Sequence, residues 1–457
     1  MATVTERLER VLEEEAPVWG VDPVPPEHRR LSGFDLGVLW GDLSIGLLVI
    51  LTGALLVPAL GFPKALLAIV VGSVIGCVPL ALVGLAGARE GLPGMVLFRP
   101  VLGRTGSYLP TVLNIAQLVG WTGFELWAMS LVADRILHVS YWFWLPVTAI
   151  ICTALALGGP ILVVRRWLER FGAWVIAAVA AWITYRLLAT ADLTAIWRAP
   201  GTGGLGFWLA VDLAVAMPVS WLPLVADYNR FARGDRSAAT GTYVGYALGN
   251  VWFYSLGALL VLSANLTDPT PAGLGTAISS LAGGAIVLLA LLVGETDEAF
   301  ADVYSAAVST QNLAERVPQR AAVLSVAAAG TGLAAWLGAR PTVALGNYES
   351  FLFLLGSVFV PLFGVFVAHY FVARGRPDER RLNARAIASW VVGFLVYQWS
   401  VPTGPGAWQD AMQTLLHVWF RLPFPLGNSA AGASIPSFFA ALVLYLLLTA
   451  PRPRRRG

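Results

Sequence analysis

ALLAIVVGSVIGCVPLALVGLAGA, residues 65–88, is a run of 24 residues without a charged side chain. A helix needs about 20 mostly apolar residues to cross the hydrocarbon core of a bilayer, so this stretch predicts a membrane span. No alternating pattern typical of a membrane β-strand accompanies it, which favours an all-α integral membrane protein. The same pattern predicts twelve spans: 34–58, 64–87, 109–133, 141–163, 171–190, 206–226, 241–265, 281–304, 322–338, 349–372, 386–401 and 432–450.

The composition of the 457 residues supports this class, with 57% hydrophobic and only 12% charged residues. A soluble protein carries about 25% charged residues, so the chain has too few charges to cover a soluble globule. This excludes a disordered chain, a nucleic-acid binder and almost any cytosolic enzyme. Cys77 and Cys152 both lie in apolar stretches, so we expect no disulfide framework, metal cluster or cofactor. Nor does any segment indicate an obligate protein partner.

Basic residues predict how the chain is oriented, because loops on the cytoplasmic side of a membrane are enriched in Lys and Arg. With both termini cytoplasmic, all but six of the 30 Lys and Arg fall on the inner side; the six are Lys64, Arg135, Arg186, Arg198, Arg340 and Arg421. We therefore expect a multi-pass protein of the cell (inner) membrane. The predicted organisation is a cytoplasmic arm (1–33), a ten-helix transport core (34–372), two extra helices (386–450) and a basic tail (451–457).

The ionisable residues inside the predicted spans are nearly all acidic. Buried charges in a bilayer are costly unless they have a partner, so such residues are functional candidates. An acidic interior with little counter-charge suits a path for a cation or for protons. The acids concerned are Asp42, Glu125, Asp212, Glu295, Asp297, Glu298 and Asp302.

The densest acidic stretch is GETDEAFAD, residues 294–302, in the eighth span. At 3.6 residues per turn, Glu295, Glu298 and Asp302 share one helix face, whereas Asp297 points elsewhere. Thr296 adds a hydroxyl oxygen of the kind that Na⁺ accepts. The alternative is that the span ends earlier and the stretch lies in a wet inner loop.

Two spans carry signs of an interruption. The first reads LWGDLSIGLL (39–48), with glycines on both sides of Asp42, and the sixth reads AMPVSWLPLVAD (216–227), with Pro218 and Pro223. If the first ten helices form two five-helix repeats of opposite orientation, about 34–190 and 206–372, these spans occupy matching positions. Interrupted helices at matching positions indicate the binding site of a transporter. The alternative is an ordinary proline kink.

The third span contains GWTGFELW, residues 120–127. Trp121 and Glu125 are four residues apart and so lie on one helix face. Trp121 falls near mid-span, away from the interfacial belts where membrane tryptophans gather. An indole beside a carboxylate suits a planar heterocycle, because the ring stacks while the acid accepts from ring N–H groups.

Four stretches resemble the nucleobase:cation symporter family, which includes cytosine, purine and allantoin permeases and the bacterial hydantoin transporter. They are GLPGMVLFRPVLGRTGS (91–107), GWTGFE (120–125), WLPLVADYNRFAR (221–233) and LLGSVFVPLFGVFVAHYFVARG (354–375). MPVSWLPLVADYNRF and DVYSAAVS (302–309) are most similar to the branch assigned to hydroxymethylpyrimidine, the thiamin precursor.

The resemblance implies a LeuT-like core of five plus five inverted helices with two additional C-terminal helices, working by alternating access. It implies a heterocycle held between helices one, three, six and eight, with Na⁺ or H⁺ bound by helix-one carbonyls and helix-eight hydroxyls. By this resemblance Trp121 stacks on the ring and Glu125 pairs with its edge. The other substrate-site positions are Pro218, Ser220, Trp221, Asp302 and Asp42, and the cation-coupling positions are Gly41, Asp42, Ile45, Thr296, Asp297 and Glu298.

Helix eight departs from the family pattern, because Thr296-Asp297-Glu298 stands where adjacent hydroxyl residues are common. A carboxylate there suits a stronger sodium site or coupling to protons. We predict a secondary active symporter, not an enzyme, that imports a nucleobase-like heterocycle of the cytosine, purine or hydroxymethylpyrimidine class. The alternatives are a proton-coupled transporter of allantoin or hydantoin, and a channel. The sequence leaves the substrate, the coupling ion, the oligomeric state and the role of Glu295 with its neighbouring acids open.

Overall fold

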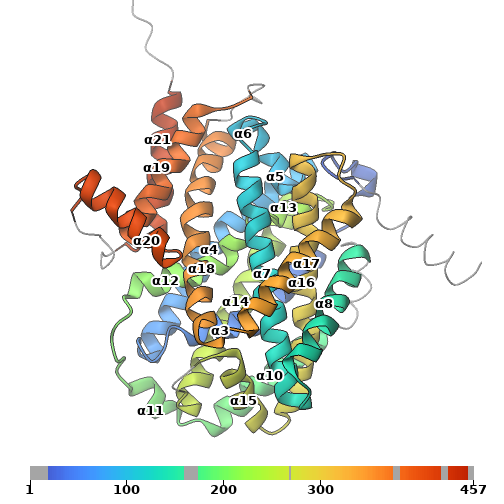
Figure 1. Ribbon diagram of the computed structural model, residues 1–457, viewed down its shortest axis with the longest axis vertical. Coiled ribbons are helices and arrows are strands. Elements are labelled where there is room, and N and C mark those ends of the chain that lie inside the picture. The colour runs from blue at the N-terminus through green and yellow to red at the C-terminus, as the bar shows by residue number, and fades with distance from the viewer. Residues whose placement is uncertain (1–18, 159–172, 267–268, 374–380, 424–430, 451–457) are drawn as a thin grey trace, which may run out of the picture.

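The computed structural model describes residues 19–158, 173–266, 269–373, 381–423 and 431–450, and its regular elements are helices (Figure 1). The predicted all-α class is therefore confirmed. Within the described ranges the only β-type pairing is an isolated bridge between Leu31 and Ala232. The predicted basic tail and most of the predicted N-terminal arm lie outside the described residues.

In chain order, the helices before and after residue 206 are described as two halves, followed by a C-terminal group, and their relation as inverted repeats stays a prediction. The first half contains η1 (Pro26–His28), α2 (Gly33–Asp42), α3 (Leu47–Ala54), α4 (Phe62–Glu90), α5 (Gly94–Leu97), α6 (Arg99–Leu102), α7 (Tyr108–Leu137), α8 (Tyr141–Gly158), α10 (Ala173–Thr190) and α11 (Leu193–Arg198). The second contains α12 (Phe207–Ser220), α13 (Val225–Asn229), α14 (Asp235–Ala264), α15 (Pro271–Ser280), α16 (Gly284–Leu313), α17 (Gln319–Gly338), α18 (Pro341–Val367) and η3 (Ala368–Val372). At the C-terminus follow α19 (Ala384–Ser400), α20 (Gly406–Gln413), η4 (Thr414–Trp419) and α21 (Ser434–Thr449).

Five segments of the described chain are long and apolar enough to cross a membrane by length and composition: α4, α12 with α13, α14, α17, and α18 with η3. The pair α2 and α3 makes a sixth if its two halves, bent by 60°, count as one span. Helix α16 has the length but carries four acids near its middle, which lower its hydropathy. The number of twelve spans stays a prediction.

Both predicted interruptions are present in the structure. Helix one breaks between α2 and α3, where Gly46 has an extended backbone and precedes the first residue of α3. Helix six breaks between α12 and α13, at residues 221–224. Pro218 lies inside α12, so the interruption falls at Pro223 rather than at the first proline. Backbone groups at each break find partners on neighbouring helices: the Leu47 N–H donates to Glu295, and the Ser220 carbonyl accepts from Gln117.

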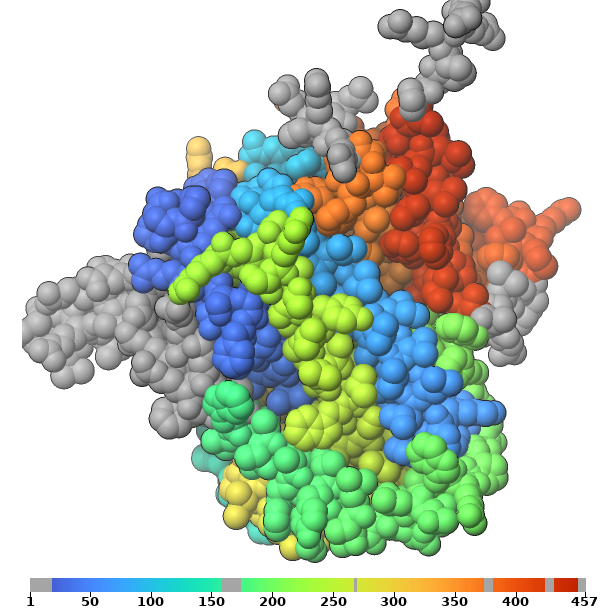
Figure 2. Space-filling model, turned by 180° about the vertical axis from the view of Figure 1, so that it is seen from behind, coloured from blue at the N-terminus to red at the C-terminus, as the bar shows by residue number. Residues whose placement is uncertain are grey.

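Helix α14 packs on the first half of helix one through small residues, and Figure 2 shows it lying between α2 and α4. Glycines recur every four residues on both helices, at 33, 37 and 41 in α2 and at 241, 245 and 249 in α14. A Cβ on Gly245 would lie 3.0 Å from the backbone nitrogen of Gly41. Such close backbone contact is typical of helix pairs in membranes, where packing replaces the hydrophobic effect as the main attraction.

The outer surface of the bundle is rich in large apolar side chains. Leu67, Ile150, Leu248, Ile286 and Leu447 are each more than half exposed. Exposed apolar surface on this scale marks contact with a membrane or a partner. With the apolar helices it fits the membrane class that the composition predicted.

Candidate functional site

Six acidic side chains are buried where helices one, three and eight meet, and we call them the acidic cluster: Asp42, Glu125, Glu295, Asp297, Glu298 and Asp302. None is more than 4% exposed. The alternative in which residues 294–302 form a wet loop is wrong, because the whole stretch lies in α16. The acids of α16 interact electrostatically with Asp42 of α2 and with Glu125 of α7.

Glu295 contacts the break in helix one directly. Its Oε1 accepts the main-chain N–H of Leu47, the first residue of α3. The first N–H groups of a helix have no partner within it, and its dipole favours an acidic group there. A Cβ on Gly46 would collide with carboxyl oxygens of both Glu295 and Glu298, so this glycine allows α16 to approach the break.

Gln117 lies on helix three, which is α7, one turn before Trp121. Its side chain contacts the break in helix six, between α12 and α13. Because α12 ends at Ser220, the carbonyl of this residue lacks the usual intrahelical donor, and the Gln117 Nε2 group donates to it at 2.9 Å. The same nitrogen donates to Asn114 Oδ1 at 2.8 Å. Asn114 in turn donates to Ser309 Oγ of α16 at 2.9 Å. Helices three, six and eight are therefore joined by buried hydrogen bonds.

Aromatic rings line the same region. The Trp121 ring is 5.2 Å from Phe351 and 6.1 Å from Tyr348, both of α18, centroid to centroid. The Tyr348 hydroxyl lies 2.7 Å from the Thr52 hydroxyl of α3. On the other side, Trp221 at the helix-six break lies edge-to-face with Trp40 of α2 at 5.9 Å.

The structure thus brings together several of the predicted site residues. Glu125 and Asp302 face each other across α7 and α16. Trp121 lies one turn from Glu125, and Asp42 interacts with Asp297 and Glu298. These residues come from three helices that the sequence separates by more than 70 residues at each step.

Other predicted site residues have contacts outside this group. The Thr296 hydroxyl donates to the Val293 carbonyl of its own helix at 2.6 Å and is partly exposed. The Pro218 ring lies against α4, where a Cβ on Gly76 would meet it at 2.5 Å. The Ser220 hydroxyl donates back to the Met217 carbonyl at 2.6 Å.

The predicted helix-one coupling positions Gly41 and Ile45 pack against α14. The Gly41 carbonyl accepts the Ser44 hydroxyl at 2.7 Å, within the break itself. Across the described residues, no three His, Cys, Asp or Glu side chains are placed to hold a metal ion.

Asp212 is the one predicted acidic candidate in helix six, and it has a structural role. Its carboxylate accepts the main-chain N–H groups of Ala433 at 2.7 Å and Ser434 at 3.1 Å. Ala433 and Ser434 lie at the N-terminus of α21. Asp212, although 221 residues away in the sequence, therefore caps that helix and attaches it to the core.

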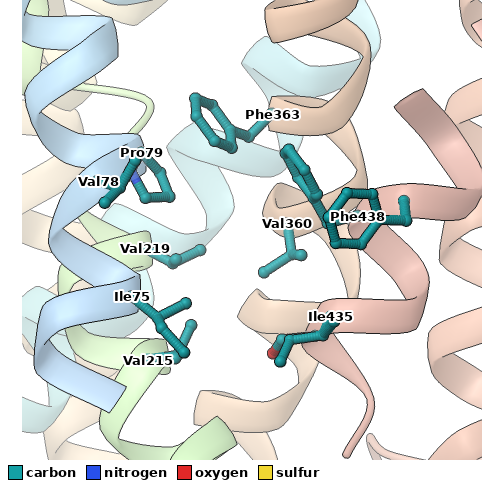
Figure 3. Close-up of a pocket in the computed structure, with 11 residues that line it drawn as sticks. Ile75, Val78, Pro79, Val215, Val219, Val360, Phe363, Ile435 and Phe438 are labelled. Carbon is teal, nitrogen blue, oxygen red and sulfur yellow. The ribbon is translucent and has the colours of Figure 1, made fainter. Parts of the chain in front are cut away.

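A hollow of about 330 Å³ lies between α4, α12, α18 and α21, away from the acidic cluster (Figure 3). Figure 3 shows Ile75, Val219, Val360, Phe363 and Phe438 lining it, and nearly all of its surface is apolar. It offers almost no polar group that could form a hydrogen bond with the edge of a heterocycle. It therefore does not match the predicted substrate site.

Comparison with known proteins identifies the family. A family model described as a permease for cytosine/purines, uracil, thiamine and allantoin matches residues 23–414. The chain belongs to this permease family. The resemblance that the four sequence stretches indicated is therefore confirmed.

Two curated relatives of this permease cover most of the chain. The hydantoin permease of Microbacterium maritypicum is 23% identical over 78% of this chain and 76% of its own length. The cytosine permease of Escherichia coli K12 is 23% identical over 81% of this chain and 84% of its own. The relatives support a membrane transporter of the nucleobase and hydantoin type rather than an enzyme.

Among solved structures, the chain is similar to Mhp1, a nucleobase-cation-symport-1 family transporter in a closed conformation with bromovinylhydantoin bound. The TM-score is 0.75 at 19% identity, and the match covers 94% of each chain. The likeness shows a shared fold.

Sequence analysis missed Gln117, Trp40 and Tyr348 as residues of this site in the permease. Gln117 could have been found, because it is four residues before Trp121 and shares its helix face. Trp40 and Tyr348 carried no local signal. Tyr348 reaches the Leu48 carbonyl, at 3.0 Å, only because the fold joins positions 300 residues apart.

Proposed function

We propose that this chain is a secondary active transporter that imports a nucleobase-like heterocycle by cation-coupled alternating access. The observation that supports this proposal is that Glu125 faces Asp302 in a buried region, and that Trp121, one turn before Glu125, packs with aromatic rings of α18. A flat ring stacks on the indole while carboxyl oxygens accept from its N–H edge. Interrupted helices at matching positions of two repeats are a common feature of transporter binding sites.

For the coupling ion we propose a cation that acts at helix eight, with H⁺ as the candidate that the side chains favour. The Thr296 hydroxyl bonds to its own helix, whereas Glu295 and Glu298 lie against the helix-one break. Carboxyl groups at that position take up and release protons, and a hydroxyl does not. Na⁺ remains the alternative, with Asp42, Asp297 and main-chain carbonyls as oxygen donors.

The test is ligand binding by the purified protein in micelles, followed by tryptophan fluorescence. The panel contains cytosine, uracil, adenine, hydantoin, allantoin and hydroxymethylpyrimidine, first in choline buffer and then with Na⁺ or at a changed pH. A coupled ion must tighten ligand binding by the factor by which the ligand tightens ion binding. Tightening by Na⁺ assigns sodium coupling, whereas a pH effect without a Na⁺ effect assigns protons.

The pocket is tested by uptake of the bound compound into proteoliposomes. Trp121→Ala should abolish uptake, while Trp142→Ala, at a tryptophan that is 55% exposed, should leave it unchanged. Near-normal uptake by the first variant would contradict the proposed pocket. If no compound of the panel binds the wild-type protein, the proposed substrate class is wrong.

A further inference from the structure

The apolar hollow between α4, α12, α18 and α21 is continuous with the outer surface of the bundle. Figure 3 shows Ile75 and Val219 on one wall and Phe438 on the facing wall. Val78 and Phe439, which also line the hollow, are 43% and 54% exposed. The hollow therefore opens on the apolar surface that a membrane-spanning chain turns toward the bilayer.

The chemistry of the lining limits what can fill this hollow. Nearly all of its surface is apolar. Water occupies a cavity where polar groups bond to it, and a cavity without such groups stays dry. A polar heterocycle would lose there the hydrogen bonds that it makes in water. The hydrocarbon chain of a lipid needs no polar partner and is already present at the mouth, so the lining fits an acyl chain.

Lys64, the only lysine of the chain, lies on the same face of α4 as the hollow. It is exposed, two residues after the first residue of that helix, and none of the ion pairs among the described residues involves it. Eleven residues separate it from Ile75, which is close to three full helical turns. Leu67, 55% exposed, and Val71 lie between them on this face. An apolar stripe thus leads from the ammonium group to the hollow.

The length of this stripe matches one leaflet of a bilayer. Eleven helical residues span about 16 Å, and half of the hydrocarbon core measures about 15 Å. A lysine near the end of a membrane helix extends its ammonium group to the polar interface, where lipid phosphates lie. A lipid with its phosphate at Lys64 would therefore bring the end of an acyl chain to the depth of Ile75.

We infer that the hollow binds one acyl chain of a membrane phospholipid, whose phosphate is held by Lys64. Helix α21 packs on α18 and α19, so the bound chain fills the space between this C-terminal helix and the core helices α4 and α12. The site is separate from the acidic cluster, and the inference does not depend on which substrate the permease carries.

The test uses purified wild-type protein in micelles after removal of lipid. It is titrated with phosphatidylglycerol that carries a photoreactive diazirine at the end of one acyl chain, and native mass spectrometry counts the bound lipids. We expect saturable binding of one lipid per chain, with crosslinks after illumination in residues 75–79 or 435–439. Diacylglycerol with the same chains lacks the phosphate and should bind at least threefold more weakly.

Two variants, each with a matched control, test the two ends of the lipid. Ile75→Trp fills the hollow and should weaken binding at least tenfold. Val74→Trp adds the same ring at a neighbouring residue that is 46% exposed and does not line the hollow, so affinity should stay within twofold. Lys64→Gln should remove the preference for phosphatidylglycerol over diacylglycerol. Arg340→Gln, at an exposed cation on the predicted outer side, should keep it.

The measurements on wild-type protein decide even if a variant does not fold. Crosslinks confined to other segments, or the absence of a saturable lipid, overturn the inference. Equal affinity for diacylglycerol and phosphatidylglycerol overturns it as well, because Lys64 would then hold no phosphate. If wild-type protein binds no lipid and forms dimers that Ile75→Trp dissociates, a second copy of the chain fills the hollow and the inference is wrong.

Discussion

Gly245 is the position where one added methyl group should disturb the core most directly. A Cβ there would lie 3.0 Å from both the carbonyl carbon of Gly37 and the nitrogen of Gly41, and closer still to the Gly37 oxygen. All three atoms belong to the backbone of α2, so no side-chain rotation relieves the contact. Gly245→Ala therefore requires α2 to move away from α14.

The expected cost combines two effects of opposite sign. Overpacking a core costs about 1–3 kcal/mol, whereas Gly→Ala inside a helix gains about 0.5–1 kcal/mol. Gly245→Ala should thus lose about 1 kcal/mol of unfolding free energy, and at most about 2.5 kcal/mol. Gly346→Ala is the matched control, because Gly346 is also inside a helix but a Cβ there meets nothing within 4 Å. The control should gain about 0.5–1 kcal/mol.

The assay is unfolding in mixed micelles with increasing SDS, read by far-ultraviolet circular dichroism. Gly245→Ala should unfold at lower SDS than wild type, and Gly346→Ala at equal or higher SDS. Because α2 ends at Asp42, the first variant should also bind substrate more weakly. If Gly245→Ala is as stable as Gly346→Ala, the close approach of α2 and α14 does not determine stability, and the reasoning fails.

Asp212→Asn replaces a carboxylate that caps α21 and should cost about 1–3 kcal/mol in the same unfolding assay. The Kd for substrate should stay within about twofold, and weaker binding with unchanged stability would contradict the structural role. Tyr348→Phe removes the 2.7 Å contact with Thr52 and should destabilise the protein by about 0.5–1.5 kcal/mol. Hydrogen exchange should become faster in α3, and unchanged exchange there would show that the contact does not hold the helix. Glu295→Gln keeps an oxygen for the Leu47 N–H but removes an ionisable group. It should preserve substrate exchange across proteoliposomes while abolishing ion-driven accumulation, and undiminished accumulation would exclude Glu295 from coupling.

The helical class, the family and the two broken helices follow from local sequence. Long uncharged runs need a bilayer, and Gly46 or Pro223 interrupts a helix through the backbone of one residue and its neighbours. The pair Trp121 and Glu125 also followed from helical spacing alone. Hydropathy did not establish the number of spans, because several predicted spans form apolar helices too short to cross a membrane by length, and α16 carries four acids near its middle.

Tertiary structure decided which predicted residues share one site. The acids Asp212 and Asp302 both lie in predicted membrane spans, and the sequence makes both of them candidates. The first caps α21 and the second faces Glu125, because distant helices bring different partners to each. Likewise, Thr296 shares a segment with Glu295 and Glu298 but turns its hydroxyl to its own backbone. Helical periodicity gives the direction of a side chain around its own axis, whereas its partner depends on which helix packs against that face.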